Sequence, residues 1–124
     1  IYGKGDQTRS FCYVSDTVNG LIHLMNSSYT LPVNIGNPNE ITIKELSEKI
    51  INIIKSKSNI KFVNLPSDDP TNRKPCIEKA KNILKWQPII NLDDGLKLTY
   101  DYFISKNKNK KKIKKVFNYP ESHE

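Results

Sequence analysis

The chain has 124 residues, which is enough for one small domain with a modest core and too few for two. Its formal net charge of +7 comes from residues 106–115, because the seven lysines there leave thirteen basic and thirteen acidic residues in the rest of the chain. This distribution excludes a basic nucleic-acid-binding face on the folded part. It predicts a disordered, solvated, lysine-rich tail with no specific nucleic-acid partner.

The first elements expected are two short strands around a glycine-rich turn at residues 3–6. Ser15 and Asp16 then offer side chains that can cap a helix. The apolar residues of that helix recur at helical spacing and should face a core: Val18, Leu21, Ile22 and Met25. Residues 32–37, PVNIGN, are predicted to form a short buried strand.

A second helix is predicted from Thr42 and Glu45, which have the spacing of a capping box. One face of it is apolar: Ile43, Leu46, Ile50, Ile53 and Ile54. Residues 59–65 are predicted to form another strand in which Ile60 and Phe62 alternate, with Leu65 as a further candidate position, and a polar loop follows from Pro66 to Pro75.

Two further helices complete the chain. A short helix should bury Ile77, Ala80, Ile83 and Leu84 and end before Trp86. The last helix is predicted from about Leu92 to Ile104, with Leu92, Leu96 and Phe103 buried. The mixture indicates an α/β or α+β class, and the few short strands suggest one edge of a larger sheet, so we expect a piece of a longer protein.

The two cysteines, Cys12 and Cys76, are too few for a disulfide framework and lack the spacing of a zinc site, which fits a reducing compartment. No apolar run approaches the roughly twenty residues that cross a membrane. The sequence contains no glycine-rich loop for a dinucleotide and no Ser-His-Asp constellation. His23 falls inside a predicted helix, where a packed or surface role is favoured over catalysis.

Arginine is rare in this chain, which has eighteen lysines and two arginines, Arg9 and Arg73, both in loop-like segments. A guanidinium grips phosphate or carboxylate through two parallel hydrogen bonds, whereas lysine is a point charge. One interpretation is therefore a bound anion. The other is an ordinary surface ion pair, such as Arg73 with Asp68 or Asp69, and composition alone favours this second interpretation.

Three stretches carry a resemblance to a known family: residues 1–27, residues 32–50 and residues 68–96. The patterns YGxGxQxRxFxYVxD, NIGNP and KxxLxWxP are similar to many nucleotide-sugar dehydratases and epimerases, and DDPxxRKPxIxKAK resembles the UDP-glucuronate decarboxylase (UDP-xylose synthase) branch. These enzymes are extended short-chain dehydrogenase/reductases. The resemblance covers about residues 1–104.

The resemblance implies the C-terminal substrate-binding part of such an α/β enzyme, with the N-terminal Rossmann part that holds NAD missing. Residues 1–104 would bind the nucleotide sugar, and residues 105–124 would be the tail. Gln7 and Arg9 would lie on the UDP side, with Arg9 on the diphosphate. Tyr2 is a weaker candidate for the nucleotide pocket, whereas Tyr13 is expected to be structural.

Arg73 would face the diphosphate and the sugar, with an auxiliary part in catalysis. In the family, C4 of UDP-glucuronate is oxidised with NAD, carbon dioxide leaves from C6, and hydride return gives UDP-xylose. We expect the NAD loop, the Tyr-x-x-x-Lys base and the active-site Glu to lie outside this segment, which would be inactive alone. No cofactor-binding or metal-binding residue is expected here.

The resemblance also implies a homodimer for the complete protein, in the cytosol or the Golgi lumen. Two departures from the pattern are Cys76, where an acid is common, and Cys12, where glutamine is common. The alternatives are a segment of a nucleotide-sugar 4,6-dehydratase or 4-epimerase, a noncatalytic nucleotide-sugar-binding remnant, and an interaction module built on the basic tail.

Overall fold

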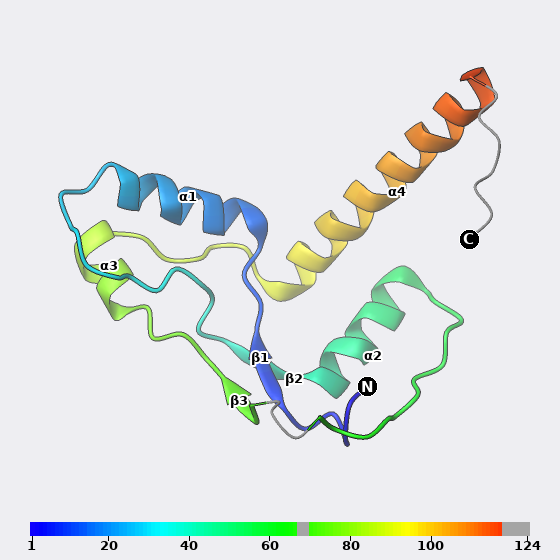
Figure 1. Cartoon of the computed structure of the whole chain (residues 1–124), viewed down its shortest axis with the longest axis horizontal. Coiled ribbons are helices and arrows are strands. Elements are labelled where there is room, and N and C mark those ends of the chain that lie inside the picture. Colours follow the sequence, from blue (N-terminus) through cyan, green and yellow to red (C-terminus); the bar gives the residue numbers. More distant parts are fainter. Residues whose placement is uncertain (67–69, 118–124) are drawn as a thin grey trace.

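A computed structural model describes residues 1–66 and 70–117, with side chains described through residue 107. The elements in chain order are β1 (Thr8–Ser10), α1 (Val14–Met25), β2 (Glu40–Thr42), α2 (Ile43–Ile54), β3 (Asn72–Arg73), α3 (Glu78–Leu84) and α4 (Leu92–Phe117). Helices α1 and α3 pack together at one end of the molecule, α2 and α4 pack together at the other, and the small sheet lies near the base of both pairs (Figure 1).

The three strands form one mixed sheet in the order β2-β1-β3. Strand β2 runs antiparallel to β1, and β3 runs parallel to it. The predicted turn before β1 is confirmed, since Gly3 and Gly5 have φ angles of 61° and 79°, which favour glycine. The first predicted strand is reduced to a single bridge between Tyr2 and Val63.

Two predicted strands are absent from the described residues, and two observed strands, β2 and β3, were not predicted. Residues 32–37 form no strand, and the segment is held instead by a side-chain bond from Asn34 to the Cys76 carbonyl at 3.1 Å. Residues 59–65 contribute only the bridge at Val63. Strand β3 instead lies inside the segment that we expected to be a polar loop, since two residues are too few to show a period.

The core is small and centres on the segment from Ile77 to Trp86. Four hydrophobic residues there are buried: Ile77, Ala80, Leu84 and Trp86. Partly buried side chains from three other segments pack against them: Cys12, Leu24, Val33 and Ile35. Burial is thus confirmed for three of the four residues predicted on this helix, whereas Ile83 is 40% exposed.

Helix α1 departs most from its prediction. Its predicted core stripe is uncovered, with Val18, Leu21 and Ile22 each 48% exposed and Met25 82% exposed. The residues of α1 that are buried are Asp16 and Gly20. The pattern correctly predicts a helix, but this face has nothing to pack against among the described residues.

The expected capping role of Asp16 is also wrong, because the N-cap residue is Tyr13 and no side chain caps the helix. The carboxylate of Asp16 accepts hydrogen bonds from the main-chain N–H groups of Ile89 and Ile90, at 3.1 and 2.9 Å. Asp16 therefore fastens α1 to the segment that leads into α4.

The capping box of α2 is confirmed. The Thr42 hydroxyl accepts from the Glu45 N–H at 3.1 Å, and the Glu45 carboxylate accepts from the Thr42 N–H at 3.1 Å and from its hydroxyl at 2.8 Å. These bonds hold the pKa of Glu45 below its ordinary value of 4.5. The bond to the Thr42 side chain has the larger effect, and the bond to the Thr42 main chain has the smaller one.

Acid is expected to weaken this cap. Since the pKa of Glu45 is lower in the folded state, its contribution to stability is present above about pH 4.5 and is lost as the pH falls through the lowered folded value. Glu45→Gln should therefore show a smaller decrease in unfolding free energy from above to below pH 4.5 than the unmutated chain. Urea titrations at matched pH measure this, and equal decreases in both proteins would contradict it.

Helix α4 continues past the expected end at Ile104 and reaches Phe117. No proline or glycine interrupts residues 105–117, and lysine is a good helix former. The division into residues 1–104 and a tail stays a prediction, and residues 118–124 lie outside the described residues. Phe103, which we expected to be buried, is 58% exposed.

Two contacts fix the start of α4. The Asn91 side chain accepts from the Asp94 N–H at 2.9 Å, and Lys49 of α2 pairs with Asp93 at 2.8 Å.

Within the described ranges, no helix is both long and apolar enough to span a membrane.

Candidate functional site

The sheet brings the two arginines of the chain together. Arg9 on β1 and Arg73 on β3 are in-register partners of the parallel pair, and Figure 1 shows the two strands side by side. In-register residues of neighbouring strands project from the same face of a sheet. The two guanidinium groups thus start from adjacent points on one face, although the strands are far apart in sequence.

The two arginines differ in exposure. Arg9 is half-buried, and its Nη1 donates a hydrogen bond to the Thr8 carbonyl at 2.7 Å, which keeps the guanidinium close to the strand. Arg73 is exposed, and its carbonyl accepts from the Ser10 hydroxyl at 3.3 Å. Two guanidinium groups that start from neighbouring points on one face of a sheet are suited to grip a diphosphate. The alternative partners Asp68 and Asp69 lie outside the described residues.

Gln7 lies just before β1, and its side chain links it to Tyr2 in the turn that leads into that strand. Gln7 is 9% exposed, and its side-chain amide donates to the Tyr2 carbonyl at 3.0 Å, while its own carbonyl accepts from the Ile43 N–H at 3.1 Å. These bonds hold the turn before β1. The Tyr2 residue is 55% exposed, so its ring is accessible. Nucleotide contacts by either residue stay a prediction.

Both cysteines are free thiols. Cys76 is exposed shortly after Arg73 in the chain, and its carbonyl accepts from the Asn34 side chain at 3.1 Å. Cys12 is half-buried against the core. Among the described residues, no group of three or more His, Cys, Asp and Glu side chains could hold a metal ion.

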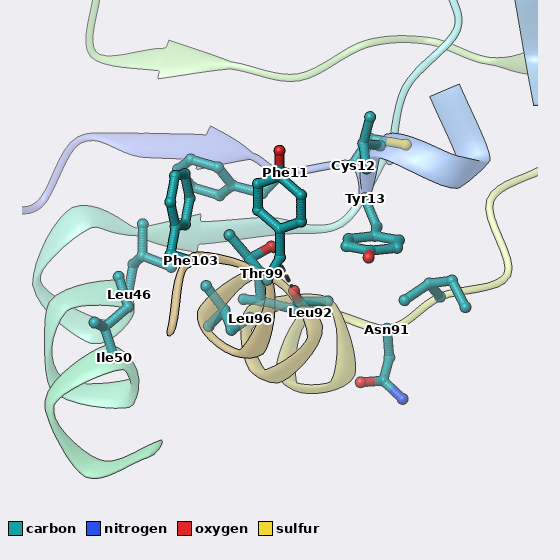
Figure 2. A pocket seen from close by; sticks show the side chains of 14 residues that line it. Phe11, Cys12, Tyr13, Leu46, Ile50, Asn91, Leu92, Leu96, Thr99 and Phe103 are labelled. Atoms are coloured by element: carbon teal, nitrogen blue, oxygen red, sulfur yellow. Dashed lines mark hydrogen bonds between the residues drawn. The ribbon is translucent and has the colours of Figure 1, made fainter. Parts of the chain in front are cut away.

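A cavity of about 740 Å³ opens between α2, α4 and the segment before α1 (Figure 2). Its walls are mainly apolar and aromatic: Phe11, Tyr13, Leu46, Ile50, Leu92, Leu96 and Phe103 among others. Thr99, one of its polar residues, turns its hydroxyl to the Gly95 carbonyl at 2.7 Å. Neither arginine lines this cavity, and the sequence did not predict it because its walls come from three separate segments.

His23 is exposed and makes one hydrogen bond to the end of α3, which agrees with the surface role that the sequence allowed. Its Nδ1 lies 3.0 Å from the carbonyl of Leu84, the last residue of α3. A carbonyl only accepts, so this nitrogen donates and satisfies a helix-end carbonyl that would otherwise lack a partner.

The spacing Tyr-x-x-x-Lys also occurs inside this chain, at Tyr102 and Lys106. That the catalytic base of the family lies outside this segment stays a prediction. Both residues lie on α4, which extends away from the sheet that carries the arginines (Figure 1). The Lys106 amine lies 5.2 Å from the centre of the Tyr102 ring, and its hydrogen bond and charge interaction with Tyr102 raise the pKa of Lys106. This pair therefore stands apart from the arginine site.

The relatives found by comparison with known proteins are UDP-glucuronic acid decarboxylases. UDP-glucuronic acid decarboxylase 1 of Danio rerio is 50% identical over 103 residues, which are 83% of this chain and 25% of that protein. UDP-glucuronic acid decarboxylase 6 of Arabidopsis thaliana is 52% identical over 103 residues, which are 83% of this chain and 30% of that protein. The chain thus spans between a quarter and a third of the length of these relatives. No family model matches the chain.

Solved structures agree on the fold. The UDP-glucose 4-epimerase of Thermotoga maritima, solved with UDP-glucose, superposes with a TM-score of 0.81 at 28% identity, over 86% of this chain and 34% of the epimerase. The UDP-glucuronic acid 4-epimerase of Bacillus cereus, solved with UDP-glucuronic acid and NAD, gives 0.76 at 27% identity, over 85% of this chain and 34% of the epimerase.

These matches confirm the resemblance and the α/β fold expected from the motifs. The chain has the fold of the C-terminal part of extended short-chain dehydrogenase/reductases, and its curated relatives at about 50% identity are UDP-glucuronic acid decarboxylases.

Proposed function

We propose that this chain is the UDP-sugar-binding segment of an NAD-dependent decarboxylase that converts UDP-glucuronate to UDP-xylose and carbon dioxide. The observation that carries the binding role is the register that places Arg9 beside Arg73. Two adjacent guanidinium groups match the two phosphates of a nucleoside diphosphate in charge and in hydrogen-bond geometry. Arg73, the more exposed of the two, is the better placed to reach the sugar as well.

The identity of the relatives supports the decarboxylase over its alternatives. Identity is about 50% to decarboxylases and 28% or less to the epimerases and dehydratase of known structure. A 4-epimerase or 4,6-dehydratase segment is therefore the second candidate, and it is favoured only by the shared fold. A noncatalytic sugar-nucleotide-binding remnant and a basic-tail interaction module explain fewer of the motifs.

The residues of this chain do not fit NAD. The sequence has no glycine-rich strand–turn–helix, and no described strand leads into such a turn. The hydride chemistry must then come from another segment, and the chain alone should be inactive. The uncovered apolar face of α1 supports such a segment, because large exposed apolar patches mark contact surfaces. We further propose that the complete protein is a homodimer.

Loss of one arginine is expected to weaken UDP binding. Arg73→Ala should raise the dissociation constant for UDP about tenfold, because a charge-assisted contact to phosphate contributes about 1.5 kcal/mol. Arg73→Lys should recover only part of this, because an ammonium lacks the two-pronged fork. Calorimetric titration of the 124-residue chain with UDP measures both variants.

Lys57→Ala is the matched control, since it removes an exposed cation from the loop after α2 and leaves the site unchanged. Equal effects of Lys57→Ala and Arg73→Ala would show that UDP responds only to net charge and would contradict the proposed site. Formation of UDP-xylose from UDP-glucuronate and NAD by the chain alone would contradict the expected inactivity.

A further inference from the structure

The face of the sheet opposite the arginines carries an acid whose contacts cross all three strands. Glu40 begins β2, and its Oε1 accepts a hydrogen bond from the Thr8 hydroxyl of β1 at 2.7 Å. Its Oε2 lies 3.8 Å from the amine of Lys74, the residue directly after β3. Because β1 lies between β2 and β3, the Glu40 side chain spans β1 to reach Lys74.

Alternation along the strands separates this acid from the arginines. Arg9 follows Thr8 on β1, and Arg73 precedes Lys74 at the end of β3, so each arginine is next in sequence to a residue that contacts Glu40. Successive residues of a strand project to opposite faces. The Glu40 contacts thus act on one face of the same two strands whose other face presents the guanidinium groups.

These side-chain contacts matter because the main-chain pairing of β3 is short. Strand β3 has two residues, and its main-chain contacts to β1 include the Thr8 N–H to Thr71 carbonyl bond at 2.9 Å. Thr8 has one hydroxyl proton, and the 2.7 Å contact to the Glu40 carboxylate is shorter than the 3.2 Å contact to the Asn72 side chain. The bond to Glu40 is therefore the one that Thr8 donates.

We propose that Glu40 is a positioning residue for the Arg9–Arg73 site. It holds the β1–β3 register through Thr8 and Lys74 and so keeps the two guanidinium groups at the spacing of a diphosphate. This inference rests on the proposed function, because it assigns a role toward the same site. If only charge mattered, removal of the Glu40 carboxylate near an anion site would strengthen UDP binding. The positioning role predicts the opposite, that removal of Glu40 weakens UDP binding.

The test compares Glu40→Ala with Glu40→Gln in the 124-residue chain, titrated with UDP and with UMP. Glu40→Ala loses both contacts and should weaken UDP binding about fivefold, with little change for UMP, which needs only one arginine. Glu40→Gln keeps an acceptor for Thr8 but loses the charged partner of Lys74, so it should weaken UDP binding by less than Glu40→Ala does. Glu48→Ala, which removes an exposed acid from α2, is the matched control and should change neither affinity.

Stronger UDP binding in both Glu40 variants would support a purely electrostatic effect and overturn the inference, as would unchanged UDP binding in Glu40→Ala. A partly unfolded Glu40→Ala would weaken UDP and UMP equally, which also counts against it. If the unmutated chain binds no UDP, the proposed function fails first. Hydrogen exchange of the Thr8 N–H then decides the positioning role, because Glu40→Ala must accelerate this exchange more than Glu40→Gln does, while Glu48→Ala leaves it unchanged.

Discussion

Replacement of Gly20 by alanine is expected to lower the free energy of unfolding by about 3 kcal/mol, since overpacking a filled core forces side chains and backbone to move. A Cβ at Gly20 would lie 2.5 Å from Cγ2 of Ile35 and 2.9 Å from Cε2 of Trp86. Both neighbours belong to the small core, where little can shift. Urea unfolding followed by Trp86 fluorescence measures the loss.

The control for this variant is Gly95→Ala in the first turns of α4. A Cβ there would meet Tyr13 at 3.4 Å, an ordinary van der Waals contact. Alanine favours a helix over glycine by up to about 1 kcal/mol, so Gly95→Ala should be neutral or stabilising. A Gly20→Ala protein as stable as Gly95→Ala would show that α1 does not pack on Trp86 as described.

Replacement of Asp16 by alanine is expected to destabilise the chain by about 3 kcal/mol, because two main-chain N–H groups lose a charged acceptor. Asp16 is 5% exposed, so water cannot easily replace the carboxylate beside Ile89 and Ile90. Asp16→Asn should lower the free energy of unfolding by less than Asp16→Ala does, because both N–H groups donate to the same oxygen and an amide also has one oxygen that can accept. Chemical unfolding of both variants gives the comparison.

Asp101→Ala is the control for Asp16, because Asp101 is exposed on α4 and its loss should change stability by no more than about 0.5 kcal/mol. A loss for Asp16→Ala no larger than that for Asp101→Ala would mean that the α1 to α4 connection contributes nothing. Hydrogen exchange at Ile89 and Ile90 provides a local readout, and both amides should exchange faster in Asp16→Ala.

The elements that sequence predicts well are those whose signals are local. Thr42 and Glu45 satisfy each other within one helical turn, so their spacing alone identifies the start of α2. The apolar spacing around Ala80 and Leu84 likewise predicts α3 and its buried face. The strand predictions fail because a strand depends on distant neighbours: residues 32–37 belong to no ladder among the described residues, and residues 59–65 pair with the start of the chain through a single bridge at Val63.

The candidate site likewise has a part that local sequence signals identify and a part that depends on contacts between distant segments. The rarity of arginine in this lysine-rich chain is enough to single out Arg9 and Arg73, but their adjacency depends on β3, which no local pattern reveals. The structural role of the Gln7 amide in the turn was equally invisible, because the partner is a main-chain carbonyl. Glu40 was missed because its contacts join three segments that are distant in sequence.

The parallel pairing of β1 with β3 has a consequence for the order in which the molecule folds. The register partners Thr8 and Asn72 are 64 positions apart, so the ladder closes a long loop and gains only two residue pairs in return. The contacts of α3 with Trp86 are local and form without that closure. We therefore expect the arginine pair to assemble after the local turn from Ala80 to Trp86 has formed.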